Sequence, residues 1–170
     1  PASVPLPQSD VASVPRESTP SLEARIMSGA LPPVHAAALG YFPDDLLQAA
    51  RCSRAQLIEQ WCGNRPLVTR VLEGSAGRLA VIVLPLLASE IYAADTRLVA
   101  AVEQALQLAE RIGARTVSLT GTIPSATRYG QLLQPVAARL PGGLRLTTGH
   151  ATTAATVALT VENTLRLAGR

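Results

Sequence analysis

The sequence predicts an α/β domain: a three-layer sandwich in which helices flank a mostly parallel sheet of four or five strands, preceded by a Pro/Ser-rich linker. Two observations predict this fold. Residues 79–87 form a continuous apolar run, which is typical of a strand buried on both faces. Residues 96–112 carry an apolar stripe at helical spacing, and a short loop then leads to a predicted strand at 117–120. Helix, short loop and buried strand form half of a βαβ unit, whose crossover should be right-handed.

The first 34 residues are dense in Pro, Ser and Ala and show no sustained periodicity, apart from a possible short helix at 21–27. We interpret residues 1–34 as a linker or tether. Residues 35–170 are then predicted to form one domain, a piece of a larger protein.

Residues 35–64 are predicted to be a helical N-terminal part, with a helix in 43–63 that has Asp44 and Asp45 in its first turn and ends at Gly63. Two strands, at 68–72 and 79–87, follow around a turn at 73–77, which suggests a hairpin.

The second half of the chain alternates predicted helices and strands. Asp95 is a plausible N-cap for the helix at 96–112, which Gly113 ends. A strand at 117–120, a short helix at 131–140 and a strand at 144–147 come next. The last helix is predicted to carry an apolar stripe of Ala154, Val157, Ala158, Val161, Leu165 and Ala168.

Composition argues against several classes of function. Aromatic residues make up 3% of the chain, and the 15 basic residues, all arginines, form no continuous stripe, so nucleic acid is an unlikely partner. The longest apolar run, at 79–88, is far short of a membrane span. Cys52 and Cys62 lack the spacing and histidine partners of a zinc site, so we expect no metal and reduced thiols in a cytoplasmic protein.

Two turns rich in hydroxyl groups and glycine follow the predicted strands at 117–120 and 144–147. If these strands are parallel neighbours, both turns open on the same sheet edge, where open α/β folds bind ligands. Such a turn before a helix can receive a phosphate, a carboxylate or a polarised carbonyl oxygen. The alternative is that Ser and Thr serve as ordinary N-caps and loop formers. The candidate substrate-binding residues are Thr120, Gly121, Thr122, Ser125, Thr148, Gly149, His150, Thr152 and Thr153.

His150, Ser125 and Tyr129 are weak candidates for catalysis. His150 stands at a predicted helix start, a position that favours a neutral imidazole, but no carboxylate lies close in sequence to orient it. Ser125 lacks a GxSxG elbow, and Tyr129 could equally be a half-buried loop anchor. A surface or structural role is the alternative for His150, and more so for His35.

Four features between residues 79 and 165 carry a family resemblance. They are an apolar strand ending in Leu84-Pro85, a long Ala/Leu helix closing on Ile112-Gly113, a strand ending at Leu119 with Gly121 close behind, and Thr147-Thr148-Gly149 with Thr153-Ala154 four residues on. In these features the chain resembles the N-terminal, substrate-binding part of the long-chain acyl-[acyl-carrier-protein] reductases that make fatty aldehydes.

The resemblance implies a cleft for an acyl thioester at the Thr120-Gly121 and Thr148-Gly149 turns. It also implies that NADPH is bound by an adjoining domain and that this domain binds no cofactor itself. The acyl-accepting cysteine of the family would lie beyond this chain, so neither Cys52 nor Cys62 inherits that role. His150 departs from the family's pattern.

We therefore expect a substrate-binding domain for an acyl or polyketide thioester, carried on the phosphopantetheine arm of an acyl carrier protein. It would be part of a multidomain reductase or a polyketide-type assembly-line enzyme, with neighbouring domains on the same polypeptide. The alternative is a non-catalytic docking or dimerisation domain of a megasynthase, in which the last helix pairs two copies. An autonomous enzyme using Ser125, Tyr129 and His150 is a third possibility.

Overall fold

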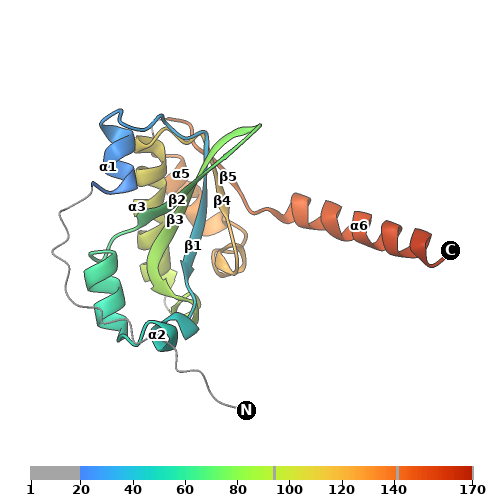
Figure 1. Cartoon of the computed structure of the whole chain (residues 1–170), viewed down its shortest axis with the longest axis horizontal. Helices are drawn as coiled ribbons and strands as arrows, with labels where there is room; N and C mark the ends of the chain where they lie inside the picture. The colour runs from blue at the N-terminus through green and yellow to red at the C-terminus, as the bar shows by residue number, and fades with distance from the viewer. Residues whose placement is uncertain (1–19, 94, 141, 170) are drawn as a thin grey trace, which may run out of the picture.

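The computed structural model describes residues 20–93, 95–140 and 142–169, and the side chains of Asp95 and of residues 150–155 also lie outside the description. Most of the predicted linker, residues 1–19, is therefore not described. The described residues form a five-stranded sheet in the order β2-β3-β1-β4-β5, with helices packed against it (Figure 1). The predicted α/β fold is confirmed.

Four strands of the sheet run parallel: β1 (Ala36–Phe42), β3 (Gly77–Leu87), β4 (Thr116–Leu119) and β5 (Arg145–Thr147). The edge strand β2 (Leu67–Gly74) is antiparallel to β3. The predicted hairpin is thus present, with Gly74 paired to Gly77 across its two-residue loop.

The central strand β1 corrects the prediction that residues 35–64 are helical. Ala36 pairs with Leu79 of β3 on one side and with Thr116 of β4 on the other. Alanine favours helices as an isolated residue. Here the tertiary context overrides that preference, because Ala37 and Leu39 are completely buried between neighbouring elements.

The predicted helix at 43–63 is two separate helices, α2 (Asp45–Ala49) and the π-helical η1 (Gln56–Trp61). Arg51 takes a positive φ of 50°, which ends the first helix. Ser53 and Gln56 then form a capping box: the Gln56 N–H donates to Ser53 Oγ (3.2 Å), and the Ser53 N–H donates to Gln56 Oε1 (2.8 Å).

One face of the sheet carries the main hydrophobic core. The long helix α3 (Asp95–Arg111) contacts β3 and β1, as its predicted stripe requires. The short segments η3 (Gln131–Leu133) and α5 (Gln134–Ala137) replace the predicted helix at 131–140 and bury Leu133 and Val136 in the same core. We call this side of the sheet the first face.

The helix α1 (Leu22–Met27) lies upstream of the predicted domain boundary at 34/35. Its N-cap is Ser21, whose Oγ accepts from the Ala24 N–H at 3.3 Å. Ile26 and Val34 are both buried in the main core. The packed part of the chain therefore begins before residue 35.

The opposite side of the sheet, here the second face, is covered only in part among the described residues. At the carboxyl ends of β1 and β3, the helices α2 and η1 enclose a smaller cluster of Phe42, Leu57, Ile58, Cys62 and Leu87. Nearer the amino ends of the same strands, alternate residues of β1 and β3 are half-buried. Helices thus flank both faces, but unequally.

The last helix, α6 (His150–Leu167), follows β5 and runs away from the sheet (Figure 1). The shorter segments η2 (Ala88–Glu90) and α4 (Ile123–Ala126) follow β3 and β4 at the carboxyl edge. Among the described residues, no helix is long and apolar enough to cross a membrane.

Candidate functional site

The two hydroxyl-rich turns lie at one edge of the sheet. β4 and β5 are adjacent and parallel, with Ser118 paired to Thr147. The turn that begins at Thr120 and the turn that begins at Thr148 therefore leave the sheet side by side, at its carboxyl edge. This is the arrangement that the spacing predicted, and it brings the two halves of the candidate site together.

β1 lies at the point where the strand order reverses. From β1 the chain goes to β3 on one side, and from β3 it crosses over to β4 on the other side. In open α/β sheets, ligands bind at the carboxyl ends of the strands beside such a switch point. The edge between β1 and β4 is consequently the position favoured by topology.

Tyr41, near the end of β1, contacts the first turn at this switch point. The Thr122 N–H and the Thr122 hydroxyl both donate to Tyr41 Oη, at 3.1 and 3.0 Å. In this arrangement the phenolic proton of Tyr41 is left to donate to a ligand oxygen. The sequence analysis missed Tyr41, because nothing in its local sequence indicates that it meets a turn 81 residues later.

Gly121 is required here for two reasons. Its φ of 58° lies in the left-handed region, and a Cβ at this position would be 2.6 Å from Tyr41 Oη. The glycine therefore allows Tyr41 to approach the backbone of the turn.

Thr120 uses its hydroxyl within the fold, because Thr120 Oγ1 donates to the Leu39 carbonyl of β1. That bond ties the start of the turn to the central strand. Of the hydroxyl-bearing residues predicted in this turn, Thr122 is the one that contacts Tyr41.

Ser125 and Tyr129 lie on the outside of the same region. Ser125 is exposed on α4, and Tyr129 is 60% exposed with a positive φ of 55°. Among the hydrogen bonds of the described residues, none joins Ser125 to an imidazole or a carboxylate, as an activated nucleophile requires. The geometry gives no support to a serine-hydrolase arrangement at this position.

The second turn is more open than the first. Gly149 has a φ of 71°, and a Cβ there would meet no atom within 4 Å. The Gly149 N–H donates to Thr147 Oγ1 at 3.3 Å, and Thr148 is half-buried. The side chains of His150, Thr152 and Thr153 lie outside the described part, although their backbone forms the first turns of α6.

A charged cluster lies after β3 at the same carboxyl edge. Glu90 Oε1 accepts from Arg54 Nε (2.8 Å) and from an Arg97 terminal nitrogen (3.3 Å), and Glu90 Oε2 accepts from the Leu87 N–H (2.9 Å). Partial burial raises the pKa of the Glu90 carboxyl. The Leu87 hydrogen bond and the two arginines outweigh that effect and hold this pKa below its ordinary value.

Asp44 forms a second polar cluster at this end of the sheet, in addition to the Glu90 cluster. Its carboxylate accepts from the Ser89 hydroxyl (2.6 Å) and from the Ser89 N–H (3.0 Å). The Glu90 cluster and the Asp44–Ser89 hydrogen bonds both connect the segment after β3 to the segment after β1. These contacts fix the positions of α2 and η1.

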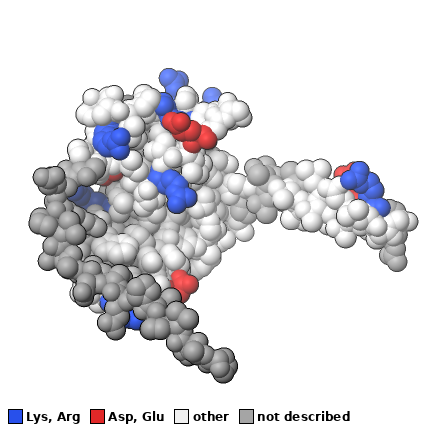
Figure 2. Space-filling model, in the orientation of Figure 1, with Lys and Arg blue, Asp and Glu red and all other residues white. Residues whose placement is uncertain are grey.

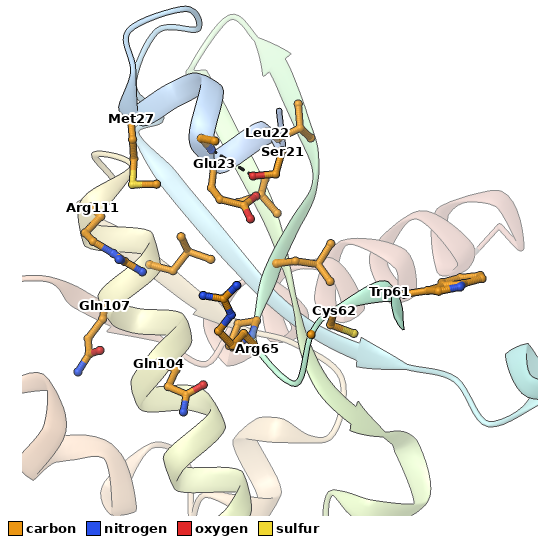
Figure 3. A pocket seen from close by; sticks show the side chains of 16 residues that line it. Ser21, Leu22, Glu23, Met27, Trp61, Cys62, Arg65, Gln104, Gln107 and Arg111 are labelled. Carbon is orange, nitrogen blue, oxygen red and sulfur yellow. Dashed lines mark hydrogen bonds between the residues drawn. The ribbon is translucent and has the colours of Figure 1, made fainter. Parts of the chain in front are cut away.

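A cavity of about 790 Å³ lies elsewhere, beside β2 at the far edge of the sheet from β5 (Figure 3). It is bounded by α1, α3 and the segment from Trp61 to Val68. The side chains of Arg65 and Arg111 extend toward it from two different elements, beside the apolar Met27 (Figure 3). No local sequence pattern predicts this cavity, because the residues that line it come from three distant segments.

Glu23 also lines this cavity, and its Oε2 atom is buried without a hydrogen-bond partner. An unsatisfied buried oxygen usually has a water, an ion or a ligand group as its partner. The cavity is thus a second place where a polar ligand could bind, apart from the two turns.

The two cysteines, and His35 just before β1, make contacts within the fold. Cys52 and Cys62 are free thiols packed in or against the second-face cluster, and burial raises the pKa of Cys62. His35 Nδ1 accepts from the Arg78 N–H at 3.0 Å. Within the described residues, no three His, Cys, Asp or Glu side chains are grouped as metal ligands.

No protein-family model matches the chain, and no curated protein matches it. The resemblance to acyl-carrier-protein reductases accordingly rests on the residues quoted above.

Proposed function

We propose that this domain binds an acyl thioester presented on the phosphopantetheine arm of an acyl carrier protein, within a larger biosynthetic enzyme. The observation that carries the proposal is the pairing of Tyr41 with Thr122 beside Gly121, at the switch point of the sheet. A phenol fixed in this way offers one directed proton to a carbonyl oxygen.

The ligand chemistry suits the two neighbouring turns. A pantetheine thioester has carbonyl oxygens that accept hydrogen bonds, and the Tyr41 phenol is a donor for one of them. Its phosphate is anionic, and the N-terminus of the 18-residue α6, which follows Gly149, has a partial positive charge. The open space at Gly149 allows such a group to approach the backbone.

The proposal assigns no redox chemistry to this domain. NADPH would be bound by an adjoining domain, and the carrier protein would supply the phosphopantetheine. A cytoplasmic location, where carrier-bound acyl groups are made and reduced, is part of the same proposal.

Titration calorimetry with an acyl-pantetheine thioester tests the proposal. We expect Tyr41→Phe and Thr122→Val each to weaken binding by about 3–10-fold, the effect of one lost hydrogen bond. Thr69→Val is a matched control, because Thr69 is an exposed threonine on β2, at the other edge of the sheet.

Native mass spectrometry with an acyl-loaded carrier protein gives the complementary readout. A complex of the domain with the loaded carrier supports the proposal, whereas a covalent acyl adduct would show that the domain also reacts. Absence of binding at millimolar thioester, or equal affinity in Tyr41→Phe and the parent protein, would overturn the proposal.

A docking or dimerisation domain is the second candidate function. It is favoured by a separate observation, the exposed apolar side chains of α6. The partner of that helix is considered next.

A further inference from the structure

α6 exposes an apolar stripe that nothing covers in the described part of the chain. Val157, Val161 and Leu165 recur every fourth residue along one side of the helix, and they are 57%, 53% and 45% exposed. Exposed apolar patches rimmed by polar residues are typical of surfaces that bind a partner. The helix runs clear of the sheet (Figure 1), so its own domain does not cover it.

Charge is sparse on this helix. Between residues 151 and 167 the sequence contains one acidic residue, Glu162, and one basic residue, Arg166. On the side of the molecule seen in Figure 2, charged atoms on α6 occupy one short stretch, and the rest of the described surface of the helix is uncharged. An apolar partner surface would therefore meet little desolvation cost.

Where β3 and β1 meet, the second face of the sheet supplies a surface of that kind, whereas β4 and β5 continue it with Thr116, Ser118, Arg145 and Thr147. Two rows of half-buried residues cross it, Leu79 beside Ala36 and Val81 beside Ala38, at registered positions of β3 and β1. β2 extends the first row with Leu72, which is 44% exposed. The cover formed by α2 and η1 lies farther along the strands, so these rows stay open.

The two surfaces fit each other in shape. The alanines of β1 leave a shallow centre between Leu79 and Val81 of β3 on one side and Thr116 and Ser118 of β4 on the other, which allows a helix to lie close to the sheet. α6 has 18 residues and is about 27 Å long. Neighbouring strands are about 4.8 Å apart, so the helix is long enough to cross every strand of this face.

The connection between β5 and α6 directs the helix away from its own sheet. Only Thr148 and Gly149 lie between the two elements, and Gly149 holds the left-handed conformation that sets the exit direction. A second copy related by a two-fold axis can receive the helix and return its own. This exchange covers the α6 stripe and the open second face of both copies in one closed interface.

We propose that α6 of one copy packs its Val157/Val161/Leu165 stripe on the open second face of a second copy, giving a reciprocal dimer. This proposal is independent of thioester binding, which involves the carboxyl-edge turns.

Sedimentation equilibrium of the purified chain gives the first test. We expect a dimer whose dissociation constant rises at least 100-fold in Val161→Asp, on the helix, and likewise in Val81→Asp, on the sheet. Asn163→Asp is the matched control, because it adds the same charge on the opposite side of α6 and should leave the dimer intact. Circular dichroism checks that each variant is folded.

Mixing the two variants distinguishes helix-on-sheet packing from helix-on-helix pairing. Val161→Asp retains an intact sheet face and Val81→Asp retains an intact helix, so the mixture should form heterodimers joined by one of the two contacts. A dimer that Val81→Asp leaves unchanged would show helix pairing and overturn the proposal. A parent chain that stays monomeric at 100 µM (roughly the range for weak dimers) would also overturn it.

Disulfide trapping identifies which copy supplies the helix. Val81→Cys and Val161→Cys are combined in a chain that also carries Cys52→Ser and Cys62→Ala. Oxidation should give a covalent dimer, seen on a non-reducing gel. A covalently closed monomer would show that α6 folds back on its own sheet, and would overturn the exchange between copies.

Discussion

The two faces of the sheet differ although they are built from the same strands. On β3, Ala80, Ile82 and Leu84 are completely buried on the first face, whereas the intervening Leu79 and Val81 on the second face are half-buried. α3 covers β3 and β1 on the first face, where α1, η3 and α5 complete the core, and α2 with η1 covers the second face at one end. In a continuous apolar run such as residues 79–87, alternate residues can thus pack in the core while the intervening residues stay available for contact with a partner.

Substitution of a leucine on each face should produce the largest difference. Leu84→Ala, at a completely buried position, should lower the free energy of unfolding by about 2–5 kcal/mol, since it leaves a cavity. Leu79→Ala on the same strand should cost less than about 1.5 kcal/mol, because part of that side chain is already in water. Urea unfolding of both, in the Val161→Asp background that exposes the second face, measures the contrast. Equal losses would show that the two faces are equally covered.

A buried polar anchor under the first face should give the next largest effect. Thr127 is completely buried, its hydroxyl donates to the Ile123 carbonyl (2.8 Å), and it accepts from the Gly130 N–H (3.2 Å). Thr127→Val keeps the shape but leaves the Gly130 N–H without this acceptor, so we expect a loss of about 1–3 kcal/mol in unfolding free energy. Thr69→Val on exposed β2 is the control, and it should change stability by less than about 1 kcal/mol. A similar small loss in Thr127→Val would contradict the role of this hydroxyl.

The Glu90 cluster, which holds α2 and η1 over the second face, should make a contribution to stability that depends on pH. The pKa of Glu90 is below its ordinary value in the folded state, so its contribution to stability is present above the unfolded pKa of about 4.3 and is lost as pH falls through the folded value. Glu90→Gln should cost about 1 kcal/mol at pH 7, and the difference from the parent chain should shrink as the pH falls below about 4.3. Thermal unfolding across this range measures both quantities. A stability difference between Glu90→Gln and the parent chain that stays constant at all pH values would mean that the charge of Glu90 does not contribute to this cluster.

The smallest expected effect concerns the two thiols of that cover. Cys52 is half-buried, whereas Cys62 is 8% exposed and burial raises its pKa. A thiol-specific reagent at pH 8 should therefore label Cys52 at least tenfold faster than Cys62. The labelling rate of Cys62 then reports how often α2 and η1 open. Equal rates, followed by mass spectrometry of the labelled peptides, would indicate that this cover is loose.

The predictable parts of the fold were those with a strong local pattern. The hairpin strands, α3 and the strands β4 and β5 follow from apolar runs and caps that stand close together in the sequence. α1 was predicted as a possible short helix at 21–27, and the break before η1 had a local signal in the Ser53/Gln56 capping box. The capping box lay inside a helical pattern and was not read as a second helix start.

The central strand and the cavity could not be predicted in the same way. β1 has the composition of a helix and becomes a strand only because β3 and β4 flank it. The adjacency of the two candidate turns was predictable from their placement after parallel strands. Tyr41 and the cavity arginines were not predictable, because their neighbours come from distant segments whose pairing no local pattern records.

The position of β1 also has a consequence for how the chain folds. Tyr41 is synthesised 81 residues before Thr122, its hydrogen-bond partner. At about 5–20 residues per second, the ribosome needs roughly 4–16 s to produce the intervening residues. Throughout that interval the central strand lacks its β4 neighbour, so the sheet cannot close around β1 until residues 116–119 have been synthesised.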